Sequence, residues 1–562
     1  MLRLFQTNEI RQVVELEGDW DFEPTDQDDH IPATYHYRMP VPGCWEMHPK
    51  LHTYRGKGVY RRTIHITEQT AVRLIFKGVS HTARVFFDGA EVAQHYNAYT
   101  PFTSRLITDV QAGEHEIVVM VDNSFHSDSK LHIANDYYTY GGLIRPVAIE
   151  YMQPVYIERL QFTPSYENGQ WQASIAAVVT NTSSASAQVR LQGALGETPI
   201  RFDAVDIQAG ETALIQTRGA FPDAQAWSNG SPNLYKLQVQ LFKDGEQTAS
   251  DDLIERVGFR TVTTANGRIQ VNGEDIVLKG FNRHEDHPMV GASFPYQLMV
   301  QDMELMLEAG SNAVRTSHYP NDERFLDLCD ERGIYVWEEN HARGLDIEHM
   351  RDPKFQEQCL VCNREMVENH VNHPCIIIWG ILNECASNTP EGREMYREQL
   401  EQIRGMDQSR PLTYATHHRE HDICFDLADI ISFNLYPQWY TDEDPGELVD
   451  RARGWAEELG GSGKPIIMSE FGGDGFYGMR DASRVRGTEE RQADIIESNL
   501  AAYTSRPYIS GMFIWQFCDC RVVEDLGWLF SRAGTQNSKG IVDKYRRPKL
   551  AFEVVKKYFE QK

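Results

Sequence analysis

The chain has 562 residues, which is too long for one hydrophobic core, so we expect two to four domains. Hydrophobic residues make up 41% of the composition and aromatic residues 11%, as in well-packed globular domains rather than disordered chains. The formal charge of −27 argues against a nucleic acid or an anionic membrane as the main partner. It does not exclude an anionic small molecule, because the charges inside a cleft can oppose the overall sign.

Targeting segments, membrane spans and cysteine usage indicate the cellular compartment. The N-terminus, MLRLFQTNEIRQ, has no apolar core of signal-peptide length, and no stretch approaches the ~20 apolar residues needed to span a membrane. The nine cysteines are scattered and odd in number, which fits reduced thiols. The sequence therefore predicts a cytoplasmic protein without a membrane partner.

The first part of the chain, to about residue 262, is predicted to be β structure. Short alternating or apolar runs recur there, separated by turn pairs such as Asp88-Gly89 and Asn123-Ser124. Two β-sandwiches fit this length, with a boundary near the run YMQPVYIERL at 151–160. No internal repeat of fixed period accompanies them.

From about residue 265 the pattern changes to apolar runs that alternate with helix-like segments. The runs resemble buried parallel strands, and eight of them in about 300 residues predict a (β/α)8 barrel. Active sites of such barrels lie at the carboxyl ends of the strands, so polar residues there are the candidates. The runs are IVLKGFN, NAVRTSHY, IYVWEEN, IIIWGILNE, LTYAT, IISFNLYP, PIIMSEFG and GMFIWQF.

Two glutamates finish predicted barrel strands. Asn383 and Glu384 end the fourth strand, and Glu470 ends the seventh. A carboxylate pair roughly 5–5.5 Å apart is what retaining glycoside hydrolysis requires, one group protonating the leaving oxygen while the other attacks the anomeric carbon. Taken singly, either glutamate could instead cap a helix or pair with an arginine. Their joint position on two strand ends favours catalysis.

The other strand ends carry donors and aromatic rings. A sugar ring is apolar on its faces and polar at its rim, so this mixture suits a carbohydrate site, although each residue could also serve packing. The candidates are His284, Arg315, His318, Tyr436, Tyr440 and Trp515.

Over its whole length the chain resembles glycoside hydrolase family 2. That resemblance implies a jelly-roll-like sugar-binding sandwich at 1–153, an immunoglobulin-like sandwich at 154–262 and a catalytic (β/α)8 barrel at 263–562. It also implies that Glu384 is the acid/base, Glu470 the nucleophile, Asn383 the ligand of the sugar 2-hydroxyl, and Tyr436 a hydrogen-bond donor to the nucleophile. The stretches that carry it are GDWDF, VPGCWE, GVYRR, YGGLIRPV, SPNLY, VGFR, GFNRHEDH, RTSHYP, NHPCIIIWGILNE and SEFG, in that order.

A motif after the eighth strand narrows the substrate. Asn537-Ser538-Lys539 resembles the Asn-x-Lys motif with which the β-glucuronidases of this family recognise the C6 carboxylate. An ammonium and an amide suit a carboxylate better than a hydroxymethyl group, and a charge-assisted hydrogen bond is worth about 1.5–3 kcal/mol. By the same resemblance Arg532 assists at the carboxylate and Asp136 binds the 4-hydroxyl. His284, Tyr440 and Trp515 are the remaining sugar contacts.

The sequence thus predicts a bacterial, exo-acting, retaining β-glucuronidase that needs no cofactor and no metal and assembles as a homo-oligomer, a dimer or a tetramer. Its substrates would be small-molecule or oligosaccharide glucuronides. Only about 30 residues separate VWEEN from VNHP, so a long loop that covers the site in some relatives is missing, and larger conjugates could enter.

Several alternatives stay open at this point. A β-galacturonidase keeps the carboxylate and differs only at C4, whereas the Asn-x-Lys motif opposes a β-galactosidase. A non-catalytic carbohydrate-binding protein is disfavoured by the intact glutamates. A metal site is suggested by the runs HEDH at 284–287 and His417-His418, but neighbouring residues at a strand end point in opposite directions. The run GGSGKP at 460–465 lacks the pattern of a phosphate-binding loop.

Overall fold

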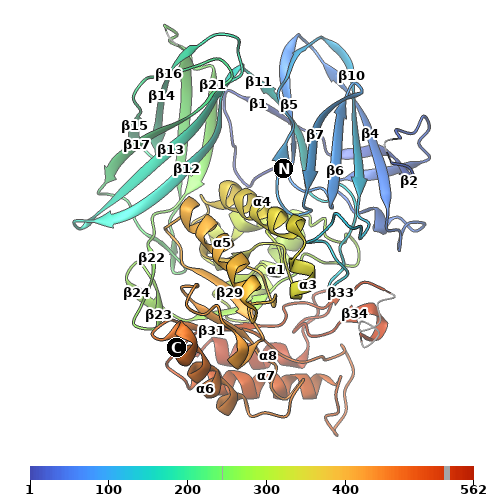
Figure 1. Cartoon of the computed structure of the whole chain (residues 1–562), viewed down its shortest axis with the longest axis vertical. Helices are drawn as coiled ribbons and strands as arrows, with labels where there is room; N and C mark the ends of the chain where they lie inside the picture. Colours follow the sequence, from blue (N-terminus) through green and yellow to red (C-terminus); the bar gives the residue numbers. More distant parts are fainter. Residues whose placement is uncertain (29, 244, 525–531, 562) are drawn as a thin grey trace.

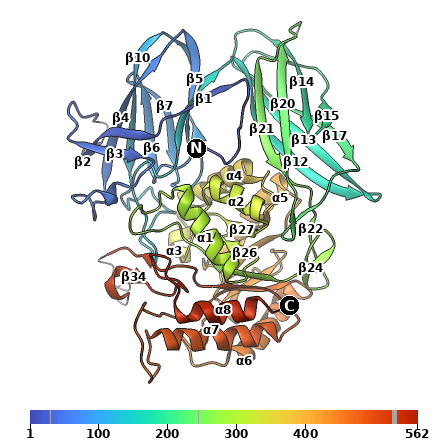
Figure 2. The same ribbon diagram turned by 180° about the vertical axis from the view of Figure 1, so that it is seen from behind.

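The computed structural model describes residues 1–28, 30–243, 245–524 and 532–561. Two β-sandwiches lie side by side at one end of the molecule, and an α/β barrel forms the other end (Figures 1 and 2). The predicted class, two β-sandwiches followed by a parallel barrel, is confirmed. Within the described part of the chain, none of the helices combines the length and the apolar character that crossing a bilayer requires.

The first sandwich contains a five-stranded sheet, ordered β1-β11-β5-β8 with β9 on β5, and a six-stranded sheet, ordered β3-β2-β4-β10-β6-β7. The predicted turn at Asp88-Gly89 joins β6 to β7, with positive φ angles of 47° and 79°. Tight hairpins need this conformation, and glycine adopts it without strain. The strands are β1 (Gln12–Glu15), β2 (Gly18–Thr25), β3 (Tyr37–Val41), β4 (Lys57–Ile66), β5 (Thr70–Phe76), β6 (Thr82–Phe87), β7 (Ala90–Tyr96), β8 (Phe102–Thr103), β9 (Ile107–Val110), β10 (Gly113–Asp122) and β11 (Val147–Met152).

The second sandwich contains a sheet ordered β12-β13-β17 and one ordered β15-β14-β20-β21, with β16 on β14. Buried and less buried residues alternate along β13, as expected for a strand with one face on the core. Its strands are β12 (Val155–Glu167), β13 (Gln170–Asn181), β14 (Ala187–Leu195), β15 (Thr198–Arg201), β16 (Val205–Ile207), β17 (Thr212–Phe221), β18 (Trp227–Ser228), β19 (Ser231–Pro232), β20 (Tyr235–Lys243) and β21 (Asp251–Val257).

A small antiparallel sheet that the sequence analysis did not anticipate precedes the barrel. Its strands are short and mostly polar, so they give no apolar run of strand length. It consists of β22 (Val262–Ala265), β23 (Arg268–Val271) and β24 (Glu274–Ile276).

The barrel closes through eight parallel strands in chain order. β28, β31 and β32 are buried at every residue, because side chains fill the barrel inside and helices cover it outside. The strands are β25 (Leu278–Asn282), β26 (Ala313–Arg315), β27 (Tyr335–Glu339), β28 (Ile376–Ile381), β29 (Leu412–Thr416), β30 (Ile431–Asn434), β31 (Ile466–Phe471) and β32 (Ile509–Ile514). The helices are α1 (Tyr296–Glu308), α2 (Glu323–Arg332), α3 (Ile347–Met350), α4 (Pro353–His370), α5 (Pro390–Met406), α6 (Pro445–Ala456), α7 (Glu489–Thr504) and α8 (Leu550–Phe559); β33 (Cys520–Arg521) pairs with β34 (Gln536–Asn537).

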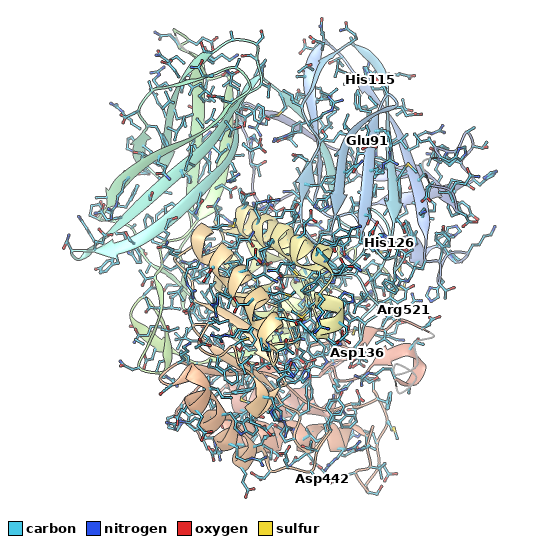
Figure 3. All side chains as sticks on the ribbon, in the orientation of Figure 1. Glu91, His115, His126, Asp136, Asp442 and Arg521 are labelled. Carbon is cyan, nitrogen blue, oxygen red and sulfur yellow. The ribbon has the colours of Figure 1, made fainter. Side chains whose placement is uncertain are left out.

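A connection of the first sandwich, between β10 and β11, reaches the mouth of the barrel. Tyr140 donates a hydrogen bond to Asp286 (2.9 Å), and Arg145 binds Glu285 (2.8 Å). All four side chains are buried. These contacts hold Asp136, on the same connection, beside the barrel (Figure 3).

Candidate active site

A cavity of about 290 Å³ opens at the carboxyl ends of the barrel strands, as the barrel fold predicts. One lining residue comes from the first sandwich, and three come from the segment after β32. The lining residues are Asp136, Arg343, Glu384, His417, Arg419, Asn434, Leu435, Tyr436, Tyr440, Thr441, Glu470, Trp515, Arg532 and Lys539.

A chain of hydrogen bonds connects the two predicted catalytic glutamates. Glu470 lies in β31, and Glu384 follows β28 with a left-handed backbone conformation (φ 53°). Asn434 Nδ2 donates to Glu384 Oε1 (2.9 Å) and to Asn383 Oδ1 (3.0 Å). Arg315 donates from Nη2 to Asn383 Oδ1 (2.8 Å) and from Nη1 to Glu470 Oε1 (2.9 Å). The two carboxyl groups therefore belong to one buried polar network.

Burial and charge affect the two glutamates differently. Burial, and then the charge of Glu384, raises the pKa of Glu470 to about 7, although Arg315 acts in the opposite direction. Burial also disfavours ionisation of Glu384, but its contact with His417 (3.6 Å) and the charge of Arg343 outweigh burial and hold the pKa of Glu384 well below its usual range. Burial and charge thus draw the proton of the pair toward Glu470.

Hydrogen bonding at Glu470 favours the opposite distribution. Its two oxygens accept from Arg315 and from the hydroxyl of Tyr436 (2.7 Å), which suits an ionised carboxylate because that group has acceptors only. Interacting buried carboxyls titrate together, so we assign the proton to the pair rather than to one residue. The pair then keeps one transferable proton up to about pH 7, the pKa of Glu470.

The predicted carboxylate-binding residues meet at another part of the same cavity. Arg532 Nε binds Asp136 Oδ1 (2.9 Å), and Asn537 Nδ2 donates to Asp136 Oδ2 (3.0 Å). Lys539 Nζ lies 3.3 Å from Asp474 Oδ1, and Arg532 Nη1 lies 3.6 Å from Asp474 Oδ2. Two cations therefore face two aspartates in a group that we call the clamp (Asp136, Asp474, Arg532, Asn537 and Lys539). The sequence predicts all of these at the site except Asp474.

Eight of the eleven predicted site residues line the cavity, and each of the other three contacts a lining residue. Asn383 belongs to the hydrogen-bond chain, Asn537 contacts Asp136, and the ring of His284 packs edge-on against Trp515 with centroids 5.4 Å apart. Among the described residues, Nδ2 of Asn383 and Nε2 of His284 are buried nitrogens without a hydrogen-bond partner. Buried polar atoms are seldom left unpaired, so these nitrogens can serve a bound ligand.

Several lining residues were not predicted, yet their positions follow the same rule. Asn434 is the last residue of β30, Arg343 follows β27, and Arg419 follows β29. The rule that barrel sites lie at the carboxyl ends of strands would have identified each of these residues. His417 was noted only as part of a histidine pair.

The HEDH run at 284–287 does not converge on one ligand position. Glu285 pairs with Arg145, whereas Asp286 accepts from Tyr140, so the two carboxylates have different partners. Elsewhere, Asp330, His373 and Cys375 bring potential metal-binding atoms within 4.8 Å of one another. His373 Nδ1 and Asp330 Oδ2 are hydrogen-bonded to each other (2.6 Å), which gives this cluster a structural role without an ion.

Comparison with known proteins agrees with the geometry. The profile described as "Glycosyl hydrolases family 2, TIM barrel domain" matches residues 262–562, more than half of the chain. The chain belongs to glycoside hydrolase family 2. The sugar binding domain of the family matches residues 12–154, and the central family 2 domain matches residues 155–260. This family 2 protein is a glycoside hydrolase.

Solved and curated relatives match 90% or more of this chain. A β-galacturonidase from Eisenbergiella tayi, solved with galacturonate, is 43% identical over 100% of this chain and 99% of that chain, with a TM-score of 0.96. A β-D-glucuronidase from Dictyoglomus thermophilum is 26% identical over 99% and 98%, with a TM-score of 0.82. The β-glucuronidase of Streptococcus agalactiae is 26% identical over 97% of this chain and 96% of that protein. A longer relative from Formosa agariphila is 27% identical, and this chain spans 64% of its length.

Proposed function

We propose that this enzyme is an exo-acting, retaining β-hexuronidase that releases terminal β-D-galacturonic acid, with β-D-glucuronides as second substrates. The observation that carries the proposal is the presence of both functional groups in one cavity. The carboxyl pair Glu384 and Glu470 lines it, and so do Arg532 and Lys539 of the clamp. One group can break a glycosidic bond, and the other can recognise a sugar carboxylate.

In the proposed reaction, Glu470 attacks the anomeric carbon while Glu384 gives its proton to the glycosidic oxygen, and the aglycone leaves. Water then attacks the glycosyl-enzyme from the side of Glu384, which takes a proton from it, and the sugar is released with its configuration retained. Arg315 and Tyr436 orient Glu470 through their hydrogen bonds. Asn434 binds Glu384, and the free amide nitrogen of Asn383 is available for the sugar 2-hydroxyl.

The choice of C4 configuration rests on similarity. The sequence predicts glucuronides as the substrates, with galacturonides as the alternative. The 43% identity to a β-galacturonidase over the whole chain now favours the alternative, because the glucuronidases reported above are only 26% identical. Glucuronides remain the second candidate, since those relatives also cover nearly all of this chain.

The test compares 4-nitrophenyl β-D-galacturonide, β-D-glucuronide and β-D-galactoside at equal concentrations with the purified enzyme. We expect kcat/KM to be highest for the galacturonide and lowest for the galactoside. A proton NMR time course on the best substrate should show the β-anomer of the free sugar first. Fastest cleavage of the galactoside would contradict the clamp, and initial release of the α-anomer would contradict the retaining mechanism.

A further inference from the structure

One wall of the cavity has no role in the reaction described above. His417 and Arg419 follow β29, Thr441 lies between β30 and α6, and all three line the cavity. Their side chains reach solvent: that of His417 is 47% exposed and that of Arg419 is 32% exposed. A ligand in the cavity can therefore contact them.

This wall lies on the side of Glu384. Nδ1 of His417 is 3.6 Å from Oε1 of Glu384. In the proposed reaction Glu384 protonates the oxygen that joins the sugar to its leaving group, so the leaving group must pass beside this carboxyl. The residues around His417 thus face the leaving group and not the sugar that is attacked.

The wall carries excess positive charge. Arg419 binds Glu443 (3.0 Å), but the same carboxylate also pairs with Arg451 and accepts from the hydroxyl of Thr441 (2.8 Å). Two guanidinium groups share one carboxylate, so this group of side chains has a net positive charge, and Arg419 presents it to the cavity. His417 lies against Glu384 and the contact raises the pKa of His417, so this pair is neutral overall and the positive charge of the wall rests on Arg419.

The backbone and the neighbouring charges agree with a binding role. Arg419 has a left-handed conformation (φ 54°), which is uncommon for a long side chain and is often kept at functional sites. Glu420 Oε1 lies 3.9 Å from Nε2 of His421. Asp442 is exposed and lies well apart from Asp136 at the lower edge of the molecule (Figure 3). Neither acidic residue lines the cavity.

We propose that His417, Arg419 and Thr441 form a leaving-group subsite that selects an anionic sugar, such as a second uronic acid. The inference rests on the proposed hexuronidase function and names the class of its natural substrate, an acidic oligosaccharide. The connection between β27 and β28 consists mostly of α3 and α4. This fully described connection therefore contains no long loop that would block such a leaving group.

The experiment uses two disaccharides that differ only in the leaving sugar. Both carry β-D-galacturonic acid at the non-reducing end, and the reducing-end sugar is either galacturonic acid or its methyl ester. We expect the wild-type enzyme to cleave the acid about tenfold better in kcat/KM, the lower end for a charge-assisted hydrogen bond to a partly exposed arginine. High salt should reduce this ratio, because screening weakens the contact.

Substitutions of Arg419 test whether the preference for the acid comes from this wall. Arg419→Ala should bring the acid-to-ester ratio close to one, and Arg419→Lys should retain part of it, because lysine keeps the charge but loses the forked geometry. Arg453→Ala is the matched control: this arginine is on α6, pairs with Glu457 and does not line the cavity. Each ratio is measured within one protein preparation, so a partly unfolded variant does not distort it.

The outcomes separate the inference from the function. An acid-to-ester ratio near one in the wild-type enzyme, with 4-nitrophenyl hexuronides still cleaved, overturns the subsite and leaves the hexuronidase intact. A ratio that Arg419→Ala leaves unchanged overturns the assignment to this wall. If the enzyme cleaves no hexuronide at all, the proposed function fails and the subsite fails with it.

Discussion

The two working parts of the cavity are built in different ways. Around Glu384 and Glu470, the partners Asn434 and Arg315 come from barrel strands and join them in one buried hydrogen-bond chain. The clamp instead combines residues of the first sandwich with residues that follow β31 and β32, and its cations are already paired with aspartates. The reacting groups are thus fixed by the barrel, whereas recognition depends on connections and on a balance of charges. Substitutions should therefore affect rate in the first region and selectivity in the second.

The largest effect is expected at Glu470. Glu470→Gln removes the nucleophile and should lower kcat by about 10⁴-fold or more, as the loss of a covalent catalyst does elsewhere. Residual hydrolysis of a 4-nitrophenyl hexuronide, with circular dichroism to verify the fold, measures this. A loss below tenfold would mean that Glu470 does not form the covalent bond.

Glu384→Gln should have a smaller effect that depends on the leaving group. General acid catalysis contributes about 10²–10⁴-fold, and a leaving sugar needs the proton far more than 4-nitrophenolate does. We expect the full loss in kcat/KM for a disaccharide and a much smaller loss for the aryl substrate. Equal losses on both substrates would argue against the role of Glu384 as the acid.

The pH profile tests whether the carboxyl pair acts as a unit. Burial raises the pKa of Glu470 to about 7, so the pair holds its last proton below that pH and loses it above. Since the reaction needs that proton, kcat/KM should fall about tenfold per pH unit above about 7, or roughly a hundredfold by pH 9. A flat profile between pH 7 and 9 would show that the transferred proton is held elsewhere.

The same division explains what the sequence could predict. Glu384 and Glu470 follow long apolar runs, so the rule that barrel sites lie at strand ends located both of them. The pairing of Asp136 with Arg532 joins residues 396 positions apart and depends on how the first sandwich docks on the barrel, which no local pattern encodes. Their place at the site was predicted only through the resemblance to family 2.

Asp474 shows a second limit. It lies four residues after Glu470 in a connection, where nothing in the local sequence distinguishes a partner of Lys539 from a solvated aspartate. The charge balance at the clamp is a property of the folded site. In the same way, Glu443 pairs with both Arg419 and Arg451 only because the fold brings the connections after β29 and β30 together. The sequence alone does not indicate this contact.

Lys539 offers a test of selectivity. Lys539→Met keeps the length of the side chain and removes its charge, so the ratio of uronide to galactoside hydrolysis should fall about 10- to 100-fold. Lys544→Met is the matched control, because Lys544 contacts the ring of Tyr545 and does not line the cavity. If both variants keep the wild-type ratio, the carboxylate of the substrate is bound by other groups.

The smallest expected effect, at Asp474, tests the balance of charges at the clamp. This carboxylate lies 3.3 Å from the ammonium of Lys539, a place that the substrate carboxylate would have to share. Asp474→Asn keeps the shape and removes the competing charge, so KM for a uronide should fall about three- to fivefold, the scale of a partly exposed ion pair. KM for a galactoside should not change. A rise in KM for the uronide would instead assign Asp474 to orienting Lys539, and the clamp would then depend on the direction of the ammonium group more than on net charge.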